Sequence, residues 1–487
     1  VELVANLEER FRLLIGGRRS RMERHQTMRG TLDWSYDLCT HVEQAVFDRL
    51  SVFPAGLDLV AARAVGGGEG VNDLDVVDVV PQLVDRSLLN RSTASDGTTR
   101  YRMLETMRAY GREHLQHEGA ADTTRGRHAR YMADTIGALS LRTVGPDEDQ
   151  VVRRLNEYLP DALVALDWFI DHGDWENGLR VTFAGHQTSE RETIEMVARL
   201  SEAARSEGAP RDLLDEIERS DQRLRLSETA RDGAERGWRA LRSHAPIPTD
   251  RLYWPPHGDF NDGGLAAADV GEFVASLERW RSAPPVNRYY AEYFMIRSLA
   301  HNRHLAHVGQ PLERFAAFVA QLHSNQASRG LAELYGVVSR SCHDWSAAAA
   351  WYGQIDAARS GGLRTWFDLT VAWHLLTARA LCEEPFELTG AQLREPWHCL
   401  REQHIDVLQW HGATSTALAL HRIGRDDVSD RLVAWAFGHD PMGSMSVFRE
   451  VLETAGLPTA QCDATEDLDV VLDRVFAIAD ELDGGAG

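Results

Sequence analysis

The sequence predicts a mainly α-helical protein, in which a winged helix (helices plus one β-hairpin) is followed by an α-helical tetratricopeptide-like repeat domain. Three observations favour this fold. Residues 23–120 carry several short helical patterns, then one hairpin pattern, then a further helix. Beyond them only helical periodicity recurs. These later helices come in pairs, spaced by about 35–40 residues, as in helical repeat proteins.

The N-terminal elements are predicted to be short helices with defined ends. Residues 5–15 have helical periodicity, which two glycines terminate before an arginine-rich connector. Thr40 and Glu43 have the spacing of a capping box and open a helix with apolar residues on one side. A short helix over 59–65 is expected next.

A change from helical to alternating periodicity indicates a β-hairpin. A helix near 76–86 precedes two short strand patterns at 87–91 and 99–103, which flank the turn sequence Ser-Asp-Gly at 95–97. Residues 105–118 return to helical periodicity. Short helices, a hairpin and a helix in this order predict a winged helix.

The rest of the chain is predicted to form stacked helix pairs. Pro160 is expected in the first turn of a helix that ends at Gly173. Three later pairs have short turns between them and suggest a solenoid. They are 314–323 with 331–342, 346–358 with 366–382, and 414–422 with 428–437.

These patterns divide the chain into six parts. The expected parts are a helix and basic connector (1–22), the winged helix (23–120), a first repeat region (121–245), a proline- and glycine-rich loop (246–264), a second repeat region (265–482) and a disordered tail (483–487).

The basic residues exclude several classes of enzyme. All 52 of them are arginine, so the chain holds no lysine. A Walker A loop, a Schiff-base enzyme and a protein kinase each need a lysine amine for their chemistry. The G-x-S-x-G and H-E-x-x-H motifs of hydrolases and metalloproteases are absent as well. We therefore expect a protein that is not an enzyme.

The net charge of −22 is unevenly distributed. Through Met132 there are 18 arginines and 19 acidic residues, so the remaining residues carry a net charge of −21. Such an acidic region disfavours binding to DNA or to a membrane surface. The N-terminus has no secretion signal and no apolar run is long enough to span a membrane, so a cytoplasmic location is expected.

Cysteine and histidine spacing gives little support for a metal site. The five cysteines are scattered and form no C-x-x-C pair. His301, His304 and His307 would place neighbouring imidazoles together on a helix, but no thiol or carboxylate accompanies them. We expect no metal and interpret the three as partly exposed helix residues.

Five stretches, taken in order, resemble one known family. They are residues 24–38 (RHQTMRGTLDWSYDL), 43–53 (EQAVFDRLSVF), 83–88 (LVDRSL), 101–110 (YRMLETMRAY) and, more weakly, 161–168 (DALVALDW). Together they resemble the winged-helix part of STAND signal-transducing ATPases of the NB-ARC type, in particular actinobacterial regulators of the AfsR and LuxR-ATPase kind. Beyond about residue 180 the similarity is only architectural.

The resemblance implies a regulatory role. In that family a nucleotide-binding domain precedes the winged helix and a helical repeat array follows it. Residues 1–17 are similar to the last helix of the lid subdomain behind the ATPase core. The chain thus resembles the C-terminal half of such a regulator. It is expected to hold no cofactor itself, and ATP or ADP only if an ATPase domain is present elsewhere.

The family's nucleotide-proximal triplet is altered. Related proteins carry Met-His-Asp at the exit of the hairpin, and the matching residues here are Met103, Leu104 and Glu105. Leucine offers neither a hydrogen-bond donor nor a positive charge, so the phosphate contact of the family's histidine cannot be assigned to Leu104. Glu105 is expected to stabilise the N-terminus of the following helix.

Two groups of residues are candidates for contacts with a partner. Arginines of the connector and of the wing could contact phosphates of DNA or of a nucleotide. They are Arg18, Arg19, Arg21, Arg24, Arg100 and Arg102, with Arg86 and Arg91 nearby. In the repeat region, Trp351, Trp366 and Trp373 fall in one helix pair and could line a ligand groove, although core packing is the alternative.

The first hypothesis is a non-enzymatic regulatory module. Its winged helix docks on an ATPase domain, in cis or in trans, while the helical repeats bind a partner protein or a small-molecule signal. The alternative is a winged-helix transcription factor that contacts DNA directly, although aspartates at 73, 75, 78 and 85 around the predicted recognition helix oppose it. An enzyme with an unrecognised site is the third reading.

Overall fold

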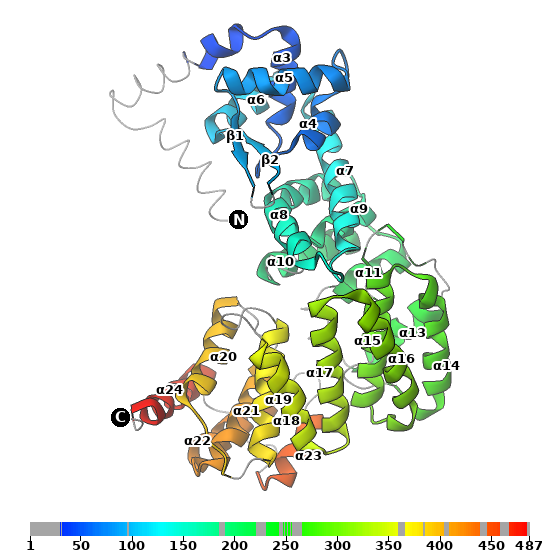
Figure 1. The fold of residues 1–487 in the computed structure, drawn as a ribbon, viewed down its shortest axis with the longest axis vertical. Helices are drawn as coiled ribbons and strands as arrows, with labels where there is room; N and C mark the ends of the chain where they lie inside the picture. The colour runs from blue at the N-terminus through cyan, green and yellow to red at the C-terminus, as the bar shows by residue number, and fades with distance from the viewer. Residues whose placement is uncertain are drawn as a thin grey trace. The chain divides into compact units, whose positions relative to one another are not determined.

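A computed structural model describes residue 30 and residues 32–94, 97–184, 190–220, 230–242, 247, 249–250, 252–253, 255, 265–358, 366–382, 385–403, 409–438, 446–457 and 467–484. The chain divides into two compact units (Figure 1). The first unit holds Val1–Ala133 with Pro160–Trp168, and the second holds Asp134–Leu159 with Phe169–Gly487. The connector arginines, most of the predicted 246–264 loop and residues 485–487 lie outside the described residues.

The first unit contains the predicted winged helix. Residues 32–37 are helical and are followed by α3 (His41–Leu50), α4 (Leu59–Gly66), α5 (Asp73–Asp85), the hairpin β1 (Asn90–Thr93) and β2 (Thr99–Arg102), and α6 (Glu105–His117). The capping box is confirmed, because the Thr40 amide donates to the Glu43 carboxylate at 2.6 Å and the Glu43 amide donates to the Thr40 hydroxyl at 3.3 Å.

The core of this unit follows from the apolar spacing of its helices. Val46, Phe47 and Leu50 of α3 are buried, as are Val76 and Leu83 of α5. Each such side chain contributes about 1.5–3 kcal/mol by leaving water. Three- and four-residue spacing places the buried side chains of each helix on one face.

Residues 160–168 belong to the first unit because a buried pair holds them there. Asp161 of α8 (Glu148–Asp171) lies 3.0 Å from Nε2 of His128 in α7 (Ala121–Ser140), and both side chains are almost fully buried. The edge of the Phe53 ring meets His128 at 4.8 Å between ring centroids. Trp168 donates from its indole to Asp122 at 3.0 Å.

The second unit is a run of helices. After the ends of α7 and α8 come α9 (Trp175–Thr182), α10 (Glu190–Ser206), α11 (Arg211–Ser220), α13 (Ala230–Arg242), α14 (Val270–Ala275), the 3₁₀ turn η3 (Ser276–Ser282), α15 (Pro285–His301), α16 (Gly309–Leu322), α17 (Asn325–Ser341), α18 (Trp345–Ala357), α19 (Trp366–Cys382), α20 (Gly390–Gln403), α21 (Gln409–Arg422), α22 (Asp426–Gly438), α23 (Ser446–Thr454) and α24 (Leu468–Gly484).

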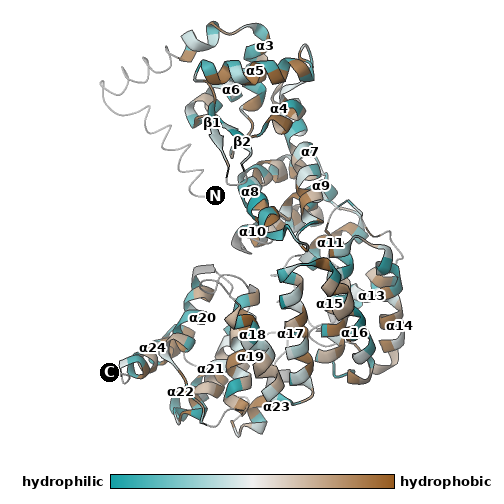
Figure 2. Cartoon of the chain, in the orientation of Figure 1, coloured by the Kyte–Doolittle hydropathy of each residue, from teal (hydrophilic) through white to brown (hydrophobic). Residues whose placement is uncertain are grey.

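The predicted helical repeats are confirmed in this unit. α17 packs on α18, α18 on α19, and α21 on both α19 and α22. Figure 2 shows hydrophobic and hydrophilic residues interleaved along these helices, as amphipathic packing requires. No helix within the described parts of the chain has the length and apolarity needed to cross a membrane.

Two predicted boundaries were wrong. Pro160 lies inside α8 instead of opening it. A proline there removes one backbone hydrogen bond at a cost of about 3 kcal/mol. Burial of Leu155, Leu166 and Phe169 on either side of Pro160 offsets that cost. The predicted tail begins within α24, since Asp483 accepts from the Gly390 amide and from Arg394.

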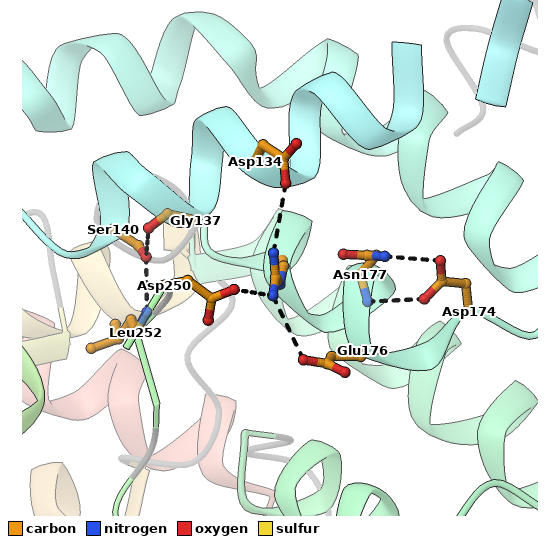
Figure 3. A network of polar contacts seen from close by, with 9 residues as sticks. Asp134, Gly137, Ser140, Asp174, Glu176, Asn177, Asp250 and Leu252 are labelled. Atoms are coloured by element: carbon orange, nitrogen blue, oxygen red, sulfur yellow. Dashed lines mark hydrogen bonds and ion pairs between the residues drawn. The ribbon is translucent and has the colours of Figure 1, made fainter. Parts of the chain in front are cut away.

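An arginine joins three segments at the start of the second unit. The mostly buried guanidinium of Arg180 pairs with three carboxylates, those of Asp134, Glu176 and Asp250 (Figure 3). Beside them, Ser140 accepts a hydrogen bond from the Leu252 amide at 3.0 Å. The end of α7, the helix α9 and the segment around 250 are thereby held together.

A second long-range contact fixes the start of α17. Glu148, at the N-terminus of α8, accepts hydrogen bonds from the Ser324 hydroxyl and, at 2.8 Å, from the Gln326 amide. Ser324 is also the N-cap of α17 and accepts from the Ala327 amide. A carboxylate at this end of a helix satisfies free amides and interacts favourably with the helix dipole.

The tryptophan groove is only partly compatible with the structure. Trp373 is 1% exposed and packs edge-on against Trp397 at 5.7 Å between ring centroids, so its assignment to a groove was wrong. Gly412 of α21 makes room for both indoles, because a Cβ there would lie 2.7 and 2.9 Å from them. Trp351 is half-buried and stacks on Tyr335. The Trp366 side chain lies outside the described residues.

A buried cation with neutral partners lies among the repeat helices. Arg340 of α17 donates to Nε2 of His374 in α19 at 2.9 Å and to Nε2 of His301 in α15 at 3.1 Å. Burial, then the nearby Arg340, hold the pKa of His374 well below its ordinary value. Burial, followed by Arg340 and Arg297, lowers the pKa of His411 to about 3.

The predicted histidine row does not form. α15 ends at His301, whose imidazole accepts from Arg340, while His304 turns back and bonds the carbonyl of Leu265 at 2.8 Å. His307 follows on a short 3₁₀ turn. Among the residues that the structure describes, no group of three or more His, Cys, Asp or Glu side chains could hold a metal ion.

We predict that Trp373→Ala destabilises the protein by about 3–5 kcal/mol, because it leaves a cavity beneath Trp397 and Gly412. Trp351→Ala serves as the matched control and should cost far less, since that indole is half exposed. Chemical denaturation followed by circular dichroism measures both. Equal losses for the two variants would contradict the core assignment of Trp373.

We also predict that the protein loses stability as the pH falls from 6.5 to 5. His374 and His411 take up protons near their ordinary pKa only when unfolded, so acid favours the unfolded state. Each contributes at most about 1.4 kcal/mol per pH unit. His374→Gln keeps an acceptor for Arg340 and should flatten the fall in melting temperature. His117→Gln, an exposed control, should leave the slope unchanged, and an unaltered slope in both variants would refute the explanation.

Candidate functional site

The wing is anchored by a third strand-like segment. β1 and β2 pair antiparallel, with Arg91 opposite Tyr101. Leu57 adds a bridge to Tyr101 through two backbone hydrogen bonds of 2.7 and 2.8 Å. Gly56 precedes it with a φ of +88°, and a Cβ there would lie 2.7 Å from the Tyr101 carbonyl. Only glycine allows this close approach.

α5, the helix that precedes the hairpin, occupies the place of the DNA-recognition helix in winged-helix proteins, and it is acidic. α5 begins at the N-cap Asn72 with a capping box to Asp75 and buries its valines and Leu83 in the core. Its sequence, DLDVVDVVPQLVD, contains four aspartates and no basic residue. Of these, Asp73, Asp78 and Asp85 are exposed. In DNA-binding winged helices this element enters the major groove, where carboxylates would repel the phosphates.

Arg86, at the end of α5, is engaged inside the unit. Its guanidinium pairs with Glu43 at 3.2 Å, and the Glu43 carboxylate is almost fully buried. Hydrogen bonds to Thr40 and the charge of Arg86 hold the pKa of Glu43 below its usual value, although burial, the largest single influence, acts in the opposite direction. Glu43 therefore links the N-terminus of α3 to the C-terminus of α5.

The two candidate arginines of the wing differ. Arg100 is buried, lies 3.8 Å from the Asp58 carboxylate and donates to the Gly56 carbonyl. Its assignment as a phosphate contact was therefore wrong, because Asp58 and the Gly56 carbonyl engage its guanidinium in a buried position. Arg102 and Arg91 are exposed at neighbouring rungs of the hairpin. Arg18, Arg19, Arg21 and Arg24 lie outside the described residues.

The triplet at the exit of the hairpin has three different environments. Met103 is buried, whereas Leu104 is 51% exposed at the N-cap of α6 and makes no side-chain capping bond. Glu105 occupies the first turn of α6, as expected, and pairs with Arg108 at 2.6 Å and Arg112 at 3.1 Å. An exposed apolar residue thus stands where the NB-ARC proteins that the sequence resembles carry a histidine.

Leu104 is one of several exposed apolar residues in this unit. Among the described residues, large hydrophobic side chains between 51% and 74% exposed occur at five positions of the first unit, and one further exposed residue, Val470, lies in the second. The five are Trp34, Leu38, Val60, Leu74 and Leu104. Val60 and Leu74 were missed from the sequence. Both stand in the first turn of a helix, outside the apolar face that the periodicity defines.

Buried polar contacts fix the helical segment that carries Trp34. The Tyr36 hydroxyl donates to the Asp48 carboxylate at 2.6 Å, and the Tyr110 hydroxyl donates to Asp33 at 2.8 Å. Burial is the main cause that raises the pKa of Asp48 to about 7. Tyr36 also packs edge-on against Phe47 and Tyr110. Residues 32–37 are therefore held firmly against α3 and α6.

Comparisons with known proteins agree with this geometry. Residues 40–116 match the family described as a winged helix-turn-helix domain. Over 182 residues the chain is 38% identical to proteins named as HTH-type transcriptional regulators of Mycobacterium bovis and Mycobacterium tuberculosis. That match covers 37% of this chain and 20% of each relative. The chain therefore spans only a small part of the length of the relatives it matches.

Two further similarities complete the comparison. An uncharacterized protein of Mycobacterium tuberculosis is 34% identical over 137 residues, which cover 27% of this chain and 34% of the relative. The crystal structure of a STAND protein with a tetratricopeptide repeat sensor from Pyrococcus horikoshii aligns with a TM-score of 0.38 and 13% identity, over 86% of this chain and 65% of that one. Residues 40–116 of the present chain are a winged helix-turn-helix domain.

Proposed function

We propose that this chain is a non-enzymatic regulatory module of a STAND-type regulator. Its winged helix docks on an ATPase domain, and its helical repeats bind a signal or a partner protein. The observation that carries the docking role is the surface of the first unit, where exposed apolar side chains accompany a recognition helix without basic residues. Exposed large apolar side chains mark a protein contact where they form one patch.

The resemblance and the relatives support the same role. The sequence is similar to the winged-helix part of STAND regulators, and the relatives at 38% identity are named as transcriptional regulators. Replacement of the family's histidine by Leu104 removes a phosphate ligand. Leu104 can instead make an apolar contact with the ATPase surface, which accounts for a leucine at an exposed N-cap.

Docking is tested with a purified STAND-type ATPase domain from the source genome, with and without ADP. Leu74→Glu and Leu104→Glu should each weaken binding at least tenfold, because a buried leucine contributes about 1.5–3 kcal/mol. Val470→Glu, at the exposed apolar residue of the second unit, should bind as the wild type does. Dissociation constants from biolayer interferometry that are the same in all four proteins would count against docking through this surface.

Direct DNA binding remains the second candidate function, because Arg91 and Arg102 are exposed on the hairpin. We predict weak, sequence-independent binding whose affinity falls steeply with salt. Arg91→Gln combined with Arg102→Gln should lower the salt slope by about 2, while Arg63→Gln should leave it unchanged. Fluorescence anisotropy at several salt concentrations measures this. Tight binding to one duplex at physiological salt, lost in the double variant, would favour the transcription-factor function instead.

The chain is also predicted not to hydrolyse ATP. It contains no lysine for a Walker A loop, and Leu104 cannot hydrogen-bond a phosphate. Phosphate release by the purified protein should equal the buffer background. Turnover that co-purifies with the chain through two further columns, and persists in Arg102→Gln, would overturn the non-enzymatic assignment.

A further inference from the structure

A cavity of about 410 Å³ opens between η3, α15 and α16 in the second unit. That volume lies within the usual range of small-molecule sites, about 300–1,000 Å³. Its apolar lining includes Val274, Leu277 and Met295 together with Phe318. Three arginines, Arg281, Arg288 and Arg314, stand around it, accompanied by Glu278 and Glu292.

The arginines of the cavity are held in different ways. Arg288 donates through Nε to the buried Glu292 at 2.7 Å, and its guanidinium lies 3.9 Å from the centre of the Phe318 ring. Arg281 pairs with Glu278 at 2.8 Å. Among the described residues, Arg314 donates hydrogen bonds only to Gln310, to its side-chain oxygen at 3.2 Å and to its backbone carbonyl at 3.4 Å. Arg314 thus has no carboxylate partner among the residues that the structure describes.

The charge of the cavity is opposite to that of the protein. Three arginines and two glutamates leave one positive charge at the lining, whereas the whole chain carries −22. A guanidinium is suited to a carboxylate or phosphate, which it can hold through two parallel hydrogen bonds. The ring of Phe318 and the aliphatic side chains beside it favour an apolar or aromatic body attached to that anion.

We infer that this cavity binds a small amphipathic anion, whose carboxylate or phosphate pairs with Arg314 and whose apolar body lies against Met295 and Phe318. This inference rests on the proposed function, in which the helical repeats bind a signal, and it names the site and the chemical class of that signal. Among the described residues, the lining of this cavity includes neither Trp351 nor Trp373, two of the tryptophans that the sequence suggested for a ligand groove. Its test is direct ligand binding, so it can fail while docking of the winged helix stands, and the reverse also holds.

The test uses isothermal titration calorimetry on the full chain with a matched set of probes. Naphthaleneacetate, naphthyl phosphate and neutral naphthaleneacetamide share one ring system, and the acetate and the acetamide differ in charge. Wild type should bind at least one of the two anions tenfold more tightly than the amide. Comparison of the two anions' dissociation constants distinguishes a carboxylate ligand from a phosphate ligand.

Two variants separate the anion contact from the cavity itself. Arg314→Met, at an exposed position, should remove the tenfold preference for the anion and keep residual binding of the ring. Ala317→Trp, also exposed, fills the cavity without changing its charge and should abolish binding of every probe. Arg422→Met removes an arginine at the end of α21, away from the lining, and should bind as wild type does. Melting curves confirm that each variant is folded.

Three results would overturn the inference. The first is the absence of saturable binding of both anions to the wild type at millimolar concentration. The second is equal affinity of the anions and the amide, since no charge contact would then exist. The third is unchanged anion binding in both Arg314→Met and Ala317→Trp, which would place the ligand elsewhere on the chain.

Discussion

Buried guanidinium groups that find acceptors hold this structure together. The sequence holds no lysine, so each buried permanent cation is a planar guanidinium that is rich in donors. Arg180 among three carboxylates and Arg340 between two imidazoles each join segments that are distant in sequence, and the partly exposed Arg86 does the same through the buried Glu43. Losing an acceptor would leave a buried charge, which is far more costly than the pair is stabilising.

Much of the fold could be predicted because local signals agreed with one another. The capping box at Thr40, the hairpin turn and the apolar spacing of α3 and α5 depend on residues only a few positions apart. Pro160 was placed wrongly for the opposite reason. Its local preference for a helix start was outweighed by packing on both sides of α8, and packing partners cannot be read from a single stretch of sequence.

The candidate sites were harder to predict than the fold. Arg100 and Arg102 are two positions apart in β2, so strand alternation places both on one face and could not distinguish the buried Arg100 from the exposed Arg102. Trp373 shares its helical spacing with surface aromatic residues, and only the glycine opposite it in α21 reveals a core position. The arginines of the cavity come from α15, α16 and η3 and have no common motif. Their meeting depends on how α15, α16 and η3 pack.

An acidic recognition helix and a partly apolar surface change what the winged helix offers a partner. Phosphate-rich DNA would meet mainly carboxylates on α5, while a protein surface with apolar pockets would meet leucine, valine and tryptophan. The first unit has the elements of a winged helix-turn-helix domain together with an acidic α5 and exposed apolar side chains. Shared architecture with DNA-binding proteins therefore does not imply a shared ligand.

The capping of α17 by Glu148 has a consequence for how the repeat region forms. A regular solenoid is stabilised by contacts between adjacent repeats, so its folding can start anywhere and spread. Here the Gln326 amide at the start of α17 donates to a carboxylate 178 positions earlier, which closes a very long loop. The N-terminal cap of α17 is complete only when α8 is in place. The stability of α17 thereby depends on a helix far along the chain as well as on the neighbouring repeats.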